Sequence, residues 1–156
     1  GLSNSMKKII SLGLVFLLAF VCFTFPASAQ EVVSINTSTS IETFTDGSYF
    51  IIETGSYPTS ARASTKNGYK TATYYTSSNV AVWAVTVNGS FSYNGTTSTA
   101  TSASCSITRY DSNTSTISKN AYTSGSSAVG TATVKYKRIY TDKTVTLTCD
   151  RNGNLS

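Results

Sequence analysis

Hydrophobic and polar residues alternate along most of the chain after residue 30, and no stretch keeps a 3.6-residue period. Such alternation is typical of β-strands with one buried face. Turn dipeptides such as Asp46-Gly47 and Asn94-Gly95 interrupt the alternation at short intervals. We therefore expect an all-β fold, an antiparallel β-sandwich of immunoglobulin-like architecture. The pattern predicts roughly nine strands, at residues 32–36, 41–45, 49–54, 70–76, 80–87, 96–109, 117–122, 128–140 and 143–150.

The segment 80–87 is apolar at both its odd-numbered and its even-numbered positions, which point to opposite faces of a strand. This pattern indicates a central strand that is covered on both faces. Beyond this segment, Asn88-Gly89 is predicted to form a bulge. Phe91 and Tyr93 then continue the parity of Trp83. These three aromatic side chains are therefore predicted core residues.

The first part of the chain has the features of a secretory signal peptide. Lys7 and Lys8 follow Met6 as a positive n-region, residues 9–25 are apolar, and Ala27-Ser28-Ala29 is a small-x-small cleavage site. An uncleaved membrane anchor is the alternative, but the apolar run is shorter than the about 20 residues of a typical span. We expect cleavage after Ala29 and a secreted protein in a Gram-positive style of export.

Cleavage divides the chain into an upstream segment with its signal peptide, residues 1–29, and a single secreted domain, residues 30–156. The full chain has 12 Lys and Arg against 7 Asp and Glu. Removing Lys7 and Lys8 leaves 12 − 2 = 10 basic residues and a net charge of +3. This mild basicity is not the signature of a nucleic-acid-binding protein. We expect contact with a membrane only through the uncleaved leader.

The chain contains no histidine. This excludes Ser-His-Asp and Cys-His catalysis, and every metal site that needs an imidazole. Asp111 and Asp150 each begin a run of alternating oxygen side chains, as calcium loops do, but no bidentate Glu follows at loop position twelve. Strand-closing turns explain both runs better. We expect no enzyme activity, no metal and no cofactor.

Hydrolysis by paired carboxylates needs two acidic side chains in one cleft. Asp46, Asp111, Asp142 and Asp150 fall at predicted turns, where Asp caps the backbone. Glu42 and Glu53 are placed to face each other across the first hairpin. Nothing in the sequence makes that hairpin a cleft.

Cys105 and Cys149 remain after the leader is removed. An even pair of cysteines in an oxidising compartment predicts a disulfide. The alternative is two buried free thiols.

Two surface features are candidate binding sites. Tyr stacks on sugar rings while Ser, Thr and Asn donate hydrogen bonds, and five tyrosines are predicted to reach solvent. The alternative for these is ordinary cross-strand packing. They are Tyr57, Tyr75, Tyr110, Tyr122 and Tyr140.

A local basic cluster is suited to an anionic wall polymer, or else forms a solvated strand face. It consists of Lys135, Lys137, Arg138 and Lys143.

Five motifs together resemble a set of small secreted proteins from Clostridia and related Gram-positive bacteria. The motifs cover nearly all of the chain after the leader. They are D-G-S-Y at 46–49, R-A-S-T-K at 62–66, Y-Y-x-S at 74–77, W-A-V-T-V-x-G-x-F-x-Y-N-G at 83–95, and T-V-T-L-T-C-x-x-N-G-x-L-S at 144–156. The resemblance implies a domain complete in itself and no particular chemistry. Relatives often have a Trp where Thr114 stands, so an aromatic platform at that turn would be weakened.

These observations favour a secreted, non-enzymatic domain that binds a glycan, a wall polymer or a protein at the cell envelope. The alternative is a secreted inhibitor or effector, for which a rigid loop at residues 55–60 would be the active element. A small hydrolase is the third possibility.

Overall fold

The computed structural model describes residues 37–58 and 64–156, which form β-strands and, within these ranges, no helix. Nothing in this part of the chain is a helix able to cross a membrane. The strands are β1 (Ser38–Thr43), β2 (Tyr49–Tyr57), β3 (Thr65–Tyr75), β4 (Ala81–Tyr93), β5 (Ser98–Arg109), β6 (Thr114–Ser124), β7 (Ser127–Tyr136) and β8 (Ile139–Thr148).

The all-β class predicted from the alternation is confirmed. Each predicted strand between residues 41 and 150 has a counterpart among the eight strands. The ninth predicted strand, at 32–36, and the predicted leader lie outside the described residues.

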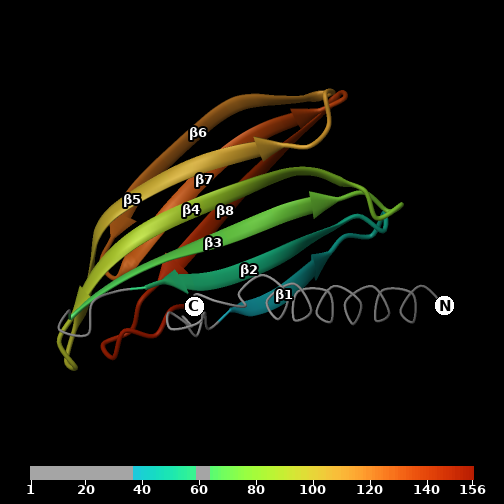
Figure 1. Ribbon diagram of the computed structural model, residues 1–156. Helices are drawn as coiled ribbons and strands as arrows, with labels where there is room; N and C mark the ends of the chain where they lie inside the picture. Colours follow the sequence, from blue (N-terminus) through green and yellow to red (C-terminus); the bar gives the residue numbers. More distant parts are fainter. Residues whose placement is uncertain (1–36, 59–63) are drawn as a thin grey trace, which may run out of the picture. The chain divides into compact units, whose positions relative to one another are not determined.

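The strands form two antiparallel sheets, one of five strands in the order β1-β2-β3-β4-β5 and one of three in the order β6-β7-β8 (Figure 1). Within each sheet, strands that follow one another in sequence are hydrogen-bonded neighbours. An immunoglobulin sandwich instead distributes strands from both parts of the chain over both sheets. The predicted two-sheet sandwich is therefore confirmed, whereas its strand order is not that of an immunoglobulin domain.

Because every strand reverses direction, the connections collect at two opposite ends of the strands (Figure 1). The turns β1–β2, β3–β4, β5–β6 and β7–β8 lie at one end, which we call the four-turn end. The other end has the β4–β5 and β6–β7 turns and the segment after β8. Two side chains can thus lie on the same sheet and still be far apart.

The two sheets share one hydrophobic core. Trp83 and Phe91 on β4 are fully buried, and Tyr93 packs against them, as their shared parity predicted. Phe50 on β2 lies 5.4 Å from the Trp83 ring, centroid to centroid. The three-stranded sheet contributes Leu147 among others. One face of β2 and of β4 is thus buried against the second sheet. On β4, residues 82–85 are all buried, so this segment is covered on both faces as its sequence predicted.

The predicted bulge at Asn88-Gly89 is not found there. The register shifts between Ser90 and Phe91, where β5 has an additional residue, Thr101. Gly89 instead allows close packing, because a Cβ at this position would lie 2.7 Å from Cβ of Ala128 in the other sheet. The glycine signal in the sequence therefore marks a close approach between the sheets.

Candidate functional site

The five candidate tyrosines do not form one surface. Phe50 and Trp83 point inward, so alternate residues place Tyr57 and Tyr75 on the outer face of the five-stranded sheet. Tyr110 directly follows β5 at the same sheet, where its N–H donates to the carbonyl of Val82. The other two candidates, Tyr122 and Tyr140, lie on the outer face of the three-stranded sheet.

Tyr57 forms one wall of a shallow hollow of about 260 Å³ on the five-stranded sheet. Tyr57 is 46% exposed, and its hydroxyl donates a 2.9 Å hydrogen bond to Oδ1 of Asn88. The Tyr69 ring packs against the Tyr57 ring at a tilt, with 5.4 Å between centroids. An exposed aromatic ring that is held by a hydrogen bond and by a neighbouring ring is a preorganised stacking surface.

The rest of the hollow is lined by amide and hydroxyl side chains and by backbone, with no charged residue among its lining groups. The side chains come from three adjacent strands, β3, β4 and β5, which pair at this point. They are Asn67, Asn88, Ser90, Ser102 and Ser104. A concave site with an aromatic wall and convergent neutral polar groups suits an uncharged polyhydroxylated ligand.

Except for Tyr57, the sequence analysis did not identify the residues of this hollow. A signal was present in Ser102, Ser104 and Ser106, which alternate with Ala103 and Cys105 along β5. Hydroxyl side chains at every second position of a strand indicate that one of its faces is polar and points outward. Only the register shows that this face continues the one carrying Tyr57 and Asn88.

A second tyrosine group lies at the four-turn end of the same sheet. Tyr49 and Tyr75 stack at 5.1 Å with nearly parallel rings, and the Tyr49 hydroxyl donates to Oδ1 of Asn79. Burial raises the pKa of Tyr75, and nearby Tyr110 raises it further. From Tyr49 to Tyr57 is eight residues along β2, or about 26 Å. The two tyrosine groups are thus separate.

The predicted basic cluster is only partly formed. Lys137 and Arg138 are exposed in the β7–β8 turn, and Lys135 lies with its Nζ 5.2 Å from the Tyr140 ring. Lys143 instead points between the sheets, where its Nζ lies 2.6 Å from the Glu42 carboxylate and 4.4 Å from the Phe50 ring centroid. Lys143 lies on the same face of β8 as the buried Val145 and Leu147, and this separates it from the other three cations.

The two cysteines are free thiols, contrary to the predicted disulfide. Cys105 lies against Gly130 and contacts the Thr131 carbonyl, whereas the N–H of Cys149 donates to the carbonyl of Ser126. Ser126 and Gly130 are four residues apart, or about 13 Å along an extended strand. A disulfide needs Cα atoms within about 7 Å. The pairing predicted from the cysteine count therefore does not fit this sandwich.

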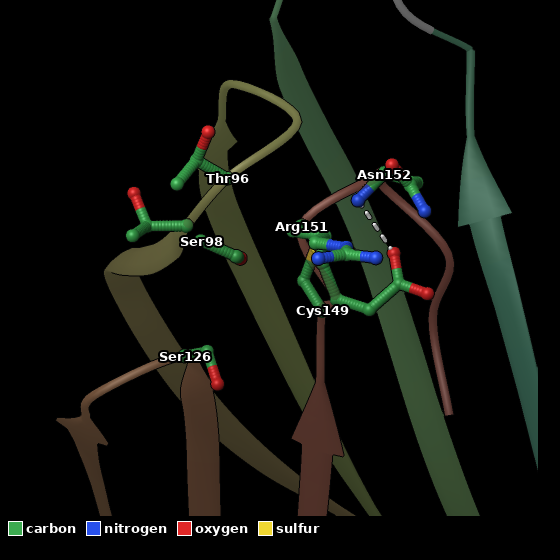
Figure 2. Close-up of a pocket in the computed structure, with 8 residues that line it drawn as sticks. Thr96, Ser98, Ser126, Cys149, Arg151 and Asn152 are labelled. Atoms are coloured by element: carbon green, nitrogen blue, oxygen red, sulfur yellow. Dashed lines mark hydrogen bonds between the residues drawn. The ribbon is translucent and has the colours of Figure 1, made fainter.

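Cys149 lines a larger, open hollow of about 630 Å³ beside the β4–β5 turn (Figure 2). The hollow is bordered by Ser98, Ser126 and Arg151 together with the thiol. The Cys149 side chain is only 1% exposed, and burial raises the pKa of its thiol. The thiol is therefore held in its protonated form at neutral pH, and the hollow offers no exposed aromatic face.

The two glutamates of the first hairpin lie apart. Glu53 pairs with Thr39 and faces outward, where it accepts a 2.7 Å hydrogen bond from Tyr69. Glu42 pairs with Phe50 and lies on the opposite side of the sheet, at Lys143. The prediction that the two glutamates face each other is wrong, because they belong to opposite parities.

Three aspartates cap turns, as predicted. Asp46 accepts from the N–H of Ser48, Asp111 from Asn113, and Asp150 from Asn152. The hydroxyl and the N–H of Ser48 lower the pKa of Asp46, and the N–H and side-chain amide of Asn154 lower the pKa of Asp150. Asp142 differs from the prediction, because it lies within β8 and accepts from the Thr133 hydroxyl. No group of three His, Cys, Asp or Glu side chains suited to a metal occurs in the two described ranges.

Two further expectations change with the structure. Gly55 and Tyr57 belong to β2, so this part of the expected inhibitor loop at 55–60 is strand, and residues 59 and 60 lie outside the described part. Thr114 is 1% exposed at the start of β6. An aromatic residue at that position would face the interior and would not build a surface platform.

The chain matches no protein-family model, no curated protein and no solved structure. The assignment of function therefore depends on the geometry of the outer faces.

Proposed function

We propose that the protein is an exported, non-enzymatic binding domain that takes a neutral glycan on the outer face of its five-stranded sheet. The hollow beside Tyr57 carries this proposal. It combines a fixed, exposed aromatic ring with amide and hydroxyl groups from three strands. A sugar ring could stack on Tyr57 while its hydroxyls exchange hydrogen bonds with Asn67, Ser102 and Ser104.

The neutral lining favours a neutral ligand over an anionic wall polymer. Lys143 forms an ion pair with Glu42, and the remaining cations of the basic cluster lie at the four-turn end. Binding at the hollow should therefore change little with salt, because exposed charges contribute little to it.

Export is part of the proposal and is supported by the signal-peptide features of residues 6–29. The resemblance to small secreted Gram-positive proteins is consistent with it. Exported protein should begin at Gln30. N-terminal sequencing of material from the culture medium tests this, and a chain that still carries residues 9–25 would contradict it.

The binding test uses the chain from Gln30 and a panel of soluble polysaccharides, including glucans, xylans, mannans and mucin glycans, with teichoic acid for comparison. We expect one neutral polysaccharide to be retained at low and high salt. Tyr57→Ala should weaken this binding by about tenfold or more. Tyr122→Ala is the matched control, since Tyr122 is 48% exposed on the other sheet.

Two results would contradict the proposal. One is equal affinity of Tyr57→Ala and the unmodified chain for the retained glycan. The other is the absence of binding to every neutral polysaccharide in the panel.

A further inference from the structure

The four-turn end carries an exposed large hydrophobic side chain in, or directly next to, every one of its turns. Five of the eight exposed large hydrophobic residues in the described ranges lie there. Scattered exposed hydrophobics are ordinary, but a group at one end indicates an interaction surface. The five are Phe44, Val80, Tyr110, Ile139 and Tyr140.

These turns are tied to one another as neighbours. The Tyr49 hydroxyl at the start of β2 donates to Asn79 in the β3–β4 turn. The N–H groups of Tyr110 and Asp111 donate to the carbonyl of Val82 just after that turn, at 2.8 and 3.2 Å. The N–H of Lys137 then donates to the carbonyl of Asn113, which joins the last two turns. The exposed hydrophobics therefore belong to one continuous row.

Positive charge accompanies this row. Lys137 and Arg138 are exposed in the β7–β8 turn next to Ile139, the most exposed of the hydrophobics at 68%. Lys137 lies with its Nζ 5.2 Å from the Tyr136 ring, as Lys135 does at Tyr140. Paired aromatic and basic side chains are typical of segments at a membrane–water interface.

The acidic residues of the same turns, all within the described ranges, form no ion pair with these cations. Asp46 accepts hydrogen bonds from the N–H and the hydroxyl of Ser48, and Asp111 accepts from the N–H of Asn113. Both carboxylates are thus directed into their own turns. The cations at the β7–β8 turn have no carboxylate within salt-bridge distance among the described residues.

We propose that the four-turn end docks onto the surface of an anionic lipid bilayer. Phe44, Val80, Tyr110 and Ile139 would enter the headgroup region, and Lys137 and Arg138 would contact anionic headgroups. Each cation near such a surface adds about 1 kcal/mol, or roughly a fivefold change in partitioning. This inference is independent of the glycan site, which lies at the other end of β2.

Co-sedimentation with large unilamellar vesicles tests the docking surface. The chain from Gln30 is used, because it contains the whole compact unit Ile35–Ser156. Vesicles of phosphatidylcholine alone are compared with vesicles of equal parts phosphatidylcholine and phosphatidylglycerol. We expect the protein to sediment with the anionic vesicles and to be released by high salt.

Two matched pairs of variants identify the surface. Lys137→Glu/Arg138→Glu should reduce binding by more than tenfold, whereas Lys119→Glu/Arg151→Glu, with the same change in net charge, should retain most of it. Tyr110→Ser should weaken binding and Tyr122→Ser should not. Thermal melting checks that each variant is folded.

The proposal is overturned if the unmodified chain sediments with neither type of vesicle, or equally with both. Equal losses in the two charge-reversed double variants would also overturn it, because net charge alone would then explain the binding. If the protein bound an anionic polysaccharide but not the vesicles, the surface would be assigned to a wall polymer instead.

Discussion

The Tyr69 ring lies over Gly55, and its hydroxyl donates to Glu53 two residues before that glycine. A Cβ at Gly55 would lie 2.6–2.7 Å from two ring carbons and the hydroxyl oxygen of Tyr69. Gly55→Ala should therefore lower the free energy of unfolding by about 1–3 kcal/mol through overpacking. Urea unfolding of the variant measures this loss.

A double-mutant cycle separates this contact from other effects of the alanine. In a Tyr69→Ala background, Gly55→Ala should cost much less, because the crowded ring is absent. An equal cost in both backgrounds would show that the ring does not constrain Gly55.

Alkaline pH should destabilise the fold through its tyrosines. Burial raises the pKa of Tyr49, Tyr69 and Tyr75 in the folded protein above the usual value near 10. The folded state then keeps protons that the unfolded state loses, so this stability is present below about pH 10 and falls as pH rises above it. Lys70 acts in the opposite sense, because burial lowers its pKa, but it is a single group.

Urea midpoints between about pH 9 and pH 11 check this dependence. Tyr69→Phe should make the fall in stability less steep, since one of the three groups no longer titrates. A midpoint that stays constant over this range, or a Tyr69→Phe profile as steep as that of the unmodified chain, would refute the assignment.

The two thiols give the clearest correction of a residue-level prediction. Both should react with a thiol reagent in unfolded protein that has not been reduced. In the folded protein Cys105 should react before Cys149, which is almost fully buried. Cys105→Ser should cost about 1 kcal/mol or less, compared with about 2–5 kcal/mol for loss of a native disulfide. If both cysteines stayed unreactive until the protein was reduced, the disulfide prediction would be correct after all.

Among the structural elements, β1 and β8 are linked across the sandwich by one side chain. Lys143 forms the ion pair with Glu42 and covers the Phe50 ring, and its side chain is only 12% exposed. Lys143→Ala should therefore cost about 1–3 kcal/mol, since it removes the pair, the cation–π contact and the packing of the stem.

Glu42→Gln should cost less, about 1 kcal/mol or below, because the Glu42 side chain is 47% exposed and glutamine keeps an acceptor. Chemical denaturation of both variants, with Lys137→Ala as an exposed control, provides the comparison. Equal stabilities of Lys143→Ala and Lys137→Ala would mean that the link between the sheets contributes nothing.

The strands themselves follow from local sequence. Alternation and turn dipeptides located every strand of the described part, since period and turn chemistry are properties of neighbouring residues. Their ends were less well predicted, because β3 begins at Thr65, five residues before its predicted start. Polar Lys66 and Asn67 carry no strand signal and are held by pairing with Phe91 and Ser90.

What the sequence could not provide is which strands share a face. Tyr57 and Tyr122 have the same residue type and similar exposure, yet register places them on opposite sheets. Likewise Lys143 differs from Lys135 only in the parity of its strand relative to the core. Pairing order decides both, and it depends on contacts between residues distant in sequence.

At the level of the whole molecule, the two proposed surfaces lie at opposite ends of the five-stranded sheet. Tyr57 is at the last residue of β2, whereas the β1–β2 turn precedes its first residue, about 26 Å away. A domain docked on a bilayer by its four-turn end would thus keep the Tyr57 hollow accessible. It would hold a glycan at the membrane surface.

This arrangement predicts that the protein bridges vesicles and polysaccharide. A labelled neutral glycan that is retained by Tyr57 should sediment with anionic vesicles only when the protein is present. Tyr57→Ala should still sediment but leave the glycan in solution, and Lys137→Glu/Arg138→Glu should bind the glycan but leave both in solution. If vesicle binding instead displaced the glycan from the unmodified chain, the two ligands would compete for one surface, and the separation of the sites along β2 would not describe how the protein binds them.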